Sequence, residues 1–180
     1  MKKLLFLAVM ILPLLGYSQS IVFCPKIDIV NISDIEGDAY VVFNDSRTYE
    51  KKLKEKCTKE ELILAISNYI EQSFPKMNIT FLPENQFSEK PEANRITYKI
   101  DIKQYDVTFY SGMYVSFTKF LIEIDDLRNG EKIYDSECNG KGSQFNILGY
   151  KSAKIATNSG FKVAFNEFTT IFENGMKGKF

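Results

Sequence analysis

The sequence contains no histidine, and this absence removes several kinds of catalytic and metal site at once. Serine or cysteine nucleophiles that rely on an imidazole base need histidine, as do metal sites with histidine ligands. The chain also has no G-x-S-x-G nucleophile elbow, and Gly175–Lys179 lacks the spacing and the hydroxyl of a phosphate-binding loop. Gly140-Lys141-Gly142 has no third glycine at the distance that a dinucleotide loop requires. No catalytic residue and no cofactor are therefore expected.

Cysteine is scarce as well, since only Cys24, Cys57 and Cys138 occur. An odd number of cysteines argues against a disulfide scaffold, and their spacings match no zinc pattern, so no metal is expected. Export to an oxidising compartment would permit one bridge, and the sequence leaves open whether any two of the three are joined. Cys138 falls in a strand pattern, where a small buried apolar residue is typical.

Long hydrophobic runs are missing from the chain beyond its first 20 residues. Lys2 and Lys3 precede an apolar stretch, Leu4–Leu15, which is shorter than the ~20 residues that span a bilayer and is interrupted by Pro13. A positive start, a short apolar core and small residues at the end are typical of a signal peptide. We therefore expect Met1–Ser20 to be a signal peptide, and a retained membrane anchor is the alternative.

The end of this segment predicts how the exported protein is processed. Small residues would permit cleavage before Gln19 or before Ile21. Cys24 follows Phe23, whereas a lipid-modified cysteine needs a small residue before it, so no lipid anchor is expected. The mature protein should be exported and soluble, in the periplasm or secreted.

The mature chain carries little net charge. Removal of the two lysines of the signal peptide leaves 21 basic against 23 acidic residues, a net charge of −2. No basic block survives, so a nucleic-acid partner is not expected. Residues 21–180 are enough for one domain with a substantial core.

Two amphipathic helices are predicted. Thr58 and Glu61 form an S/T-x-x-E capping box at the start of the first, and Pro75 ends it. Asn174-Gly175 is expected to cap the end of the second. The second has an apolar face with three- and four-residue steps, formed by Phe161, Ala164, Phe165, Phe168, Ile171 and Phe172.

Alternating or compact apolar segments predict the strands. They are Ile21–Val30 (edge strand or coil), Ala39–Asn44, Asn78–Leu82, Arg95–Phe109, Met113–Asp125 and Lys132–Gly140. Ser111-Gly112 and Asn129-Gly130 are expected to be turns. The remaining segments are read as loops: a charged one at Tyr49–Lys56, a polar one at Pro83–Asn94, and one marked by Gly140, Gly142 and Gly149.

The strand pattern changes phase on the way to the Ser111-Gly112 turn. Apolar residues occupy even positions from Ile96 to Ile102 and odd positions from Tyr105, which a β-bulge would produce. In the next strand, apolar residues occupy even positions over Phe120–Ile124 and odd positions at Val115 and Phe117, so this strand should change phase as well. Paired bulges could then tilt a two-stranded ribbon away from the sheet. The fold class is predicted to be α+β, an antiparallel sheet with a meander and two amphipathic helices packed on one face.

Acidic residues offer only weak candidate sites. Asp34, Glu36 and Asp38 flank Gly37, but the glycine is misplaced for a calcium-binding EF-hand loop, and a solvated turn is favoured. Two carboxylates could still meet from distant parts of the chain, so a carboxylate-dependent hydrolase stays an alternative.

Aromatic residues gather around the Ser111-Gly112 turn. The cluster consists of Tyr105, Phe109, Tyr110, Tyr114 and Phe117. Both faces of the strands carry rings here, so a sheet covered on one side would leave several of them exposed. Exposed rings are typical of partner surfaces, whereas a cover by the helices would place the cluster in the core. Both interpretations remain open, and we take the five residues as candidate partner-binding residues.

From Ser20 onward the chain resembles the YajG family of small bacterial envelope proteins. The shared features are the opening strand "IVFCP", a glycine followed by a strand that ends in Asp45 and Arg47, an amphipathic helix, a long meander with an N-G turn, and a closing helix. Family members are typically lipoproteins, but Cys24 lies inside the opening strand, so the anchor does not carry over. The resemblance implies no catalytic residues and favours a binding role.

The sequence thus favours an exported, non-enzymatic envelope domain of unknown specific role. It would act as a protein-binding or adaptor module, with another envelope protein as its partner. The alternative is a small-ligand-binding domain with a groove between sheet and helices. The oligomeric state is left open.

Overall fold

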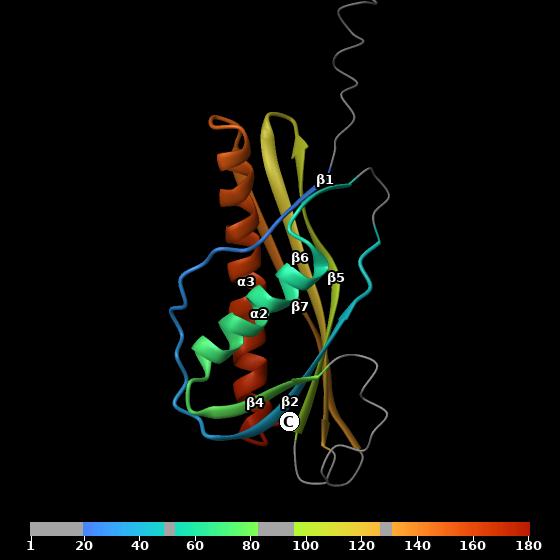
Figure 1. The fold of residues 1–180 in the computed structure, drawn as a ribbon, viewed down its shortest axis with the longest axis vertical. Coiled ribbons are helices and arrows are strands. Elements are labelled where there is room, and N and C mark those ends of the chain that lie inside the picture. Colours follow the sequence, from blue (N-terminus) through green and yellow to red (C-terminus); the bar gives the residue numbers. More distant parts are fainter. Residues whose placement is uncertain (1–19, 49–52, 83–95, 127–130) are drawn as a thin grey trace, which may run out of the picture.

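The computed structural model describes residues 20–48, 53–82, 96–126 and 131–180 (Figure 1). The elements in chain order are β1 (Ser20–Phe23), β2 (Gly37–Asp45), β3 (Leu53–Lys56), α2 (Lys59–Ser73), β4 (Met77–Leu82), β5 (Ile96–Tyr110), β6 (Met113–Asp126), β7 (Glu131–Phe145) and α3 (Tyr150–Met176). The predicted signal peptide up to residue 19, the loop at residues 83–94 and the turn at residues 129–130 lie outside the described residues.

The seven strands form one mixed sheet that divides along β5. β5, β6 and β7 make the predicted antiparallel meander. The other edge of β5 pairs in parallel with β2 along its first half and antiparallel with β1 further on. On the outer sides, β4 pairs in parallel with β2, and β3 pairs in parallel with β1. The α+β class is confirmed, but a plain antiparallel sheet is wrong, because the crossover through α2 returns the chain parallel to β2.

β5 changes partner close to a bulge. Its pairing with β6 shifts between Ile102 and Gln104. Buried apolar side chains occupy even positions up to Ile102 and odd positions at Tyr105 and Val107, as the sequence predicts. The bulge is therefore the point at which β5 leaves β2 and turns its edge toward β1.

β6 keeps a single phase over its whole length. The row of buried side chains that contains Phe120 continues through the small polar residues Thr118 and Ser116. Val115 and Phe117 consequently lie on the opposite face. The predicted second phase switch is wrong, since the two apolar residues face outward. β7 pairs with β6 as far as Met113, the first residue of β6. The end of the β5–β6 hairpin is therefore three-stranded and not a two-stranded ribbon.

Both helices pack on the same face of the sheet (Figure 1). The capping box is confirmed: the Glu61 N–H donates to the Thr58 hydroxyl (3.2 Å), and the Thr58 N–H donates to the Glu61 carboxylate (2.8 Å). α3 continues past the predicted cap, and the positive φ falls at Gly178 instead. The core between sheet and helices is mainly aromatic on the α3 side, where it contains Phe161, Phe165, Phe168 and Phe172.

α3 lies directly on the backbone of β7. A Cβ atom on Gly140 would stand 1.9 Å from the Gly160 carbonyl oxygen, and one on Gly142 would stand 2.0 Å from that of Ala156. The Ser116 hydroxyl donates to the same Ala156 carbonyl at 2.6 Å. The predicted loop at these two glycines is wrong, because a close helix–strand contact and not a turn requires them.

A strand and a disulfide near residue 57 were not predicted. The segment read as a charged loop contains β3, which pairs in parallel with β1 so that Phe23 is opposite Lys56. The next residue of each chain segment is a cysteine, and Cys24 and Cys57 are joined with their Cα atoms 4.9 Å apart. Cys138 is buried and free, as its strand pattern indicated.

Candidate functional site

One end of the molecule exposes a concentration of apolar side chains. The Asn146 N–H donates to the Gly112 carbonyl (3.0 Å), so the β7–α3 connection lies against the β5–β6 turn (Figure 1). Of the thirteen exposed large apolar side chains in the described part of the chain, seven lie here. We call this surface the apolar end. Its residues are Phe109, Tyr110, Phe117, Phe145, Ile147, Leu148 and Tyr150.

The five aromatic residues singled out in the sequence have different environments. Tyr105 belongs to the core: it is 1% exposed, and its hydroxyl donates to the Phe23 carbonyl at 2.7 Å. Tyr114 is half-buried, with its ring 5.3 Å from that of Phe109 on the neighbouring strand. Tyr110, by contrast, is 74% exposed. Tyr105 is thus no surface residue, and partner binding by the other four stays a prediction.

The second half of the apolar end was not predicted from the sequence. Phe145, Ile147, Leu148 and Tyr150 are all exposed, and Ile147 is 77% exposed. They follow one another closely in a segment that was read as a glycine-marked loop. Four large apolar residues in a presumed surface loop were the signal that could have found this surface.

Lysines surround the apolar end. The Lys54 ammonium donates to the Tyr150 hydroxyl at 2.7 Å, and this hydrogen bond lowers the pKa of Tyr150. Lys141 lies 5.7 Å from the centre of the Phe117 ring. The flanking segments 53–56, 104–118 and 139–154 contain five lysines in all: Lys54, Lys56, Lys141, Lys151 and Lys154. The same three segments contain two acidic residues, Glu55 and the buried Asp106. The apolar end is therefore locally positive.

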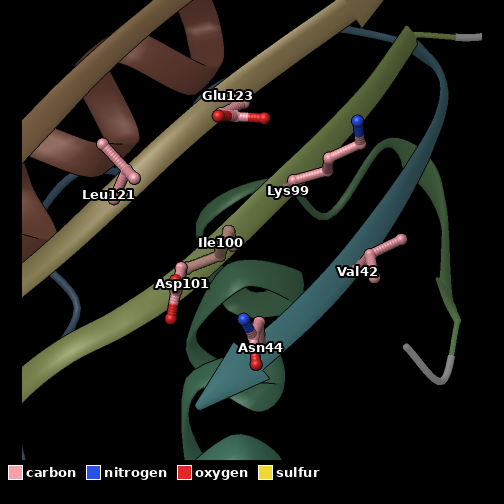
Figure 2. A pocket seen from close by; sticks show the side chains of 7 residues that line it. All are labelled: Val42, Asn44, Lys99, Ile100, Asp101, Leu121 and Glu123. Atoms are coloured by element: carbon pink, nitrogen blue, oxygen red, sulfur yellow. The ribbon is translucent and has the colours of Figure 1, made fainter. Parts of the chain in front are cut away.

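A groove of about 250 Å³ lies on the helix-free face of the sheet. Figure 2 shows its lining side chains: Val42, Asn44, Lys99, Ile100, Asp101, Leu121 and Glu123. Its charged groups already have partners within the chain. Lys99 pairs with Asp125 at 2.5 Å and Asp101 with Lys103 at 2.5 Å. Burial acts to raise the pKa of Asp101, but hydrogen bonds from Lys103 and Ser46 outweigh it and lower that pKa.

The groove expected between sheet and helices is filled by side chains. The Tyr98 and Phe172 rings stack at 4.0 Å between centroids, and the Phe74 ring lies 4.5 Å from that of Phe172. The Tyr98 hydroxyl donates to the Phe172 carbonyl (2.9 Å). Packed rings leave little room there for a ligand, which weakens the small-ligand alternative.

The titratable groups give little support to catalysis. Burial raises the pKa of the Cys138 thiol to about 12, so it stays protonated and is a poor nucleophile at neutral pH. Among the described carboxyl groups with a shifted pKa, each is shifted downward, whereas a general acid needs a raised one. The sulfurs of Cys24 and Cys57 lie close to Glu61. They are joined to each other, however, and do not form a thiolate metal site.

No family model matches the sequence, and no curated protein matches it. Among solved structures, the fold is similar to that of protein XCC0632 from Xanthomonas campestris, of the DUF330 family. The TM-score is 0.59 at 4% identity, over 89% of this chain and 98% of that one. At this identity the likeness shows a shared fold alone.

Two weaker likenesses have TM-scores below 0.5 and do not establish a shared fold. Lipoprotein GNA1162 from Neisseria meningitidis gives 0.44 at 10% identity, over 74% of this chain and 99% of that one. Hypothetical protein CT253 from Chlamydia trachomatis gives a TM-score of 0.48 at 14% identity, over 78% of this chain and 96% of that one. The resemblance to YajG proteins stays a prediction. No helix within the described ranges is long and apolar enough to cross a membrane.

Proposed function

We propose that this chain is an exported, non-enzymatic module of the cell envelope, similar to YajG proteins. It works as an adaptor that binds another envelope component through its apolar end. After removal of the signal peptide, the domain acts in the periplasm or outside the cell as a soluble protein.

The observation that supports this proposal is the concentration of exposed apolar side chains at one end. Side chains such as Tyr110 and Ile147 are more than 70% exposed, although burying an apolar side chain is worth about 1.5–3 kcal/mol. Three separate segments, β5–β6, β7 and the start of α3, bring such residues to one surface. Large apolar side chains that are exposed together at one end of a molecule are typical of interaction sites.

Photo-crosslinking in the native host tests the proposal. A benzoylphenylalanine residue would replace Tyr110 in one variant and Leu64, 61% exposed on α2, in a control variant. We expect an adduct with an envelope component from position 110 and none from position 64. Absence of any adduct from position 110 would contradict the proposed function.

A further inference from the structure

We infer that the apolar end docks on the surface of an anionic lipid bilayer. This inference rests on the proposed function, because it names the partner of the same surface. Three observations carry it: the mixture of side chains at that end, the local excess of lysine, and the direction in which the chain enters the fold.

The side chains of the apolar end match the interfacial layer of a bilayer. Tyrosine and phenylalanine rings stand beside the aliphatic side chains of Ile147 and Leu148. Aromatic rings concentrate at the level of lipid headgroups, and aliphatic side chains enter the adjoining acyl region. These residues sit on a turn and a connection that form one extremity of the elongated molecule (Figure 1). A projecting surface can enter a lipid interface without a partner of complementary shape.

The charge at this end is complementary to anionic headgroups. The mature chain has a net charge of −2, yet the segments around the apolar end carry five lysines against Glu55 and the buried Asp106. Lysines close to a membrane surface are attracted by its negative potential. A protein partner would instead need an apolar pocket with a matching acidic rim.

The chain enters the fold from the same end. β5 runs toward the Ser111-Gly112 turn, and β1 is antiparallel to it with Ile21 opposite Val107. Ser20 therefore lies on the turn side of that pair, so the first described residue is at the apolar end. The predicted signal segment, with its apolar stretch Leu4–Leu15, would hold this end toward the membrane before cleavage.

Vesicle flotation of the mature protein, without the signal segment, tests the inference. The probes are vesicles of phosphatidylethanolamine with phosphatidylglycerol, and vesicles of phosphatidylcholine alone. We expect the protein to float with the anionic vesicles, less with the neutral ones, and less again at high salt. A double variant, Tyr110→Ser with Ile147→Ser, should lower the partition coefficient by about tenfold or more, because two apolar side chains no longer enter the interface.

Leu64→Ser with Val163→Ser is the matched control, since both side chains are exposed on the helices away from the apolar end. Its partition coefficient should equal that of the unmodified protein, and thermal melts should show both double variants folded. Vesicle binding that is absent, or equally reduced in both double variants, would overturn the inference. If vesicles do not bind while position 110 still crosslinks to a protein, the inference fails and the proposed function stands. If neither result appears, both fail.

Discussion

Gly142→Ala is expected to be strongly destabilising, because it adds one methyl group where α3 rests on β7. The new Cβ would stand 2.0 Å from the Ala156 carbonyl oxygen and 2.6 Å from the Gly160 nitrogen. Cβ atoms in real structures essentially never approach a neighbour closer than 3.0 Å, so helix and strand must separate by about 1 Å. The obstructing atoms belong to the backbone of α3, and no side-chain rotation can relieve the contact.

The cost follows from the packing that this separation disturbs. Overpacking a core costs about 1–3 kcal/mol, and a backbone contact places this variant at the upper limit, about 3 kcal/mol. In a domain of this size each kcal/mol lowers Tm by roughly 2–4 °C, which predicts a fall of about 6–12 °C. The Ser116 hydroxyl, which donates to the Ala156 carbonyl, would lose its present geometry as well.

Thermal unfolding followed by circular dichroism measures the effect. Ser143→Ala, on an exposed neighbouring position of β7, is the control and should change stability by less than about 0.5 kcal/mol. A Tm of Gly142→Ala within about 2 °C of the unmodified protein would be no larger a shift than that expected of the control. In that case α3 could not lie on the backbone of β7. A close helix–strand contact would then not be the reason for glycine at positions 140 and 142.

Three further experiments test the core, the disulfide and the apolar end. Phe168→Ala should cost about 3–5 kcal/mol, since its ring is buried in the aromatic core, and an unchanged urea midpoint would show that α3 is not docked. Replacing Cys24 and Cys57 with serine should cost about 2–4 kcal/mol, and reduction of the unmodified protein should lower the denaturation midpoint equally; no change on reduction would argue against the bridge. Tyr110→Ala should stay within about 1 kcal/mol while Tyr114→Ala costs more, because Tyr114 packs against the small buried cluster that contains Val107, whereas Tyr110 is 74% exposed; calorimetry that ranks them the other way would refute this placement.

Local signals in the sequence were sufficient for much of the fold. The capping box at Thr58 and Glu61 satisfies backbone donors within one helical turn, so it requires no knowledge of the rest of the chain. The change of phase between Ile102 and Tyr105 likewise predicted the bulge in β5. The turn at Ser111-Gly112 is confirmed by positive φ values at both residues. Such features depend on neighbours a few residues apart.

Features that depend on distant partners were missed. β3 is too short and too charged to be recognised, and it becomes a strand only beside β1. Without that pairing, the sequence could not place Cys24 next to Cys57. Gly140 and Gly142 were read as turn residues, because glycine at a helix contact and glycine in a loop look alike in a sequence.

Only part of the apolar end was predicted, because its residues come together through contacts between distant segments. Tyr110 was identified from a cluster that is local in the sequence, whereas Tyr105 turned inward after the bulge to meet the carbonyl of Phe23. Phe145 joins the surface because it pairs with Met113 at the start of β6, and Ile147 because the β7–α3 connection is bonded to the β5–β6 turn. Tertiary contacts therefore decided which aromatic residues are core and which are surface.

Footprinting of the folded protein shows whether the apolar end is its contact surface. Carbene labelling followed by mass spectrometry would compare the mature protein alone with the protein mixed with the isolated envelope fraction of its host. We expect labelling at Tyr110, Phe145 and Ile147 to fall severalfold, because side chains that are buried in an interface are no longer accessible to the carbene. Labelling at Leu64 and Val163, which are also exposed but lie on the helices, should not change. Equal loss at all five positions, or no loss at the apolar end, would contradict its role as the contact surface.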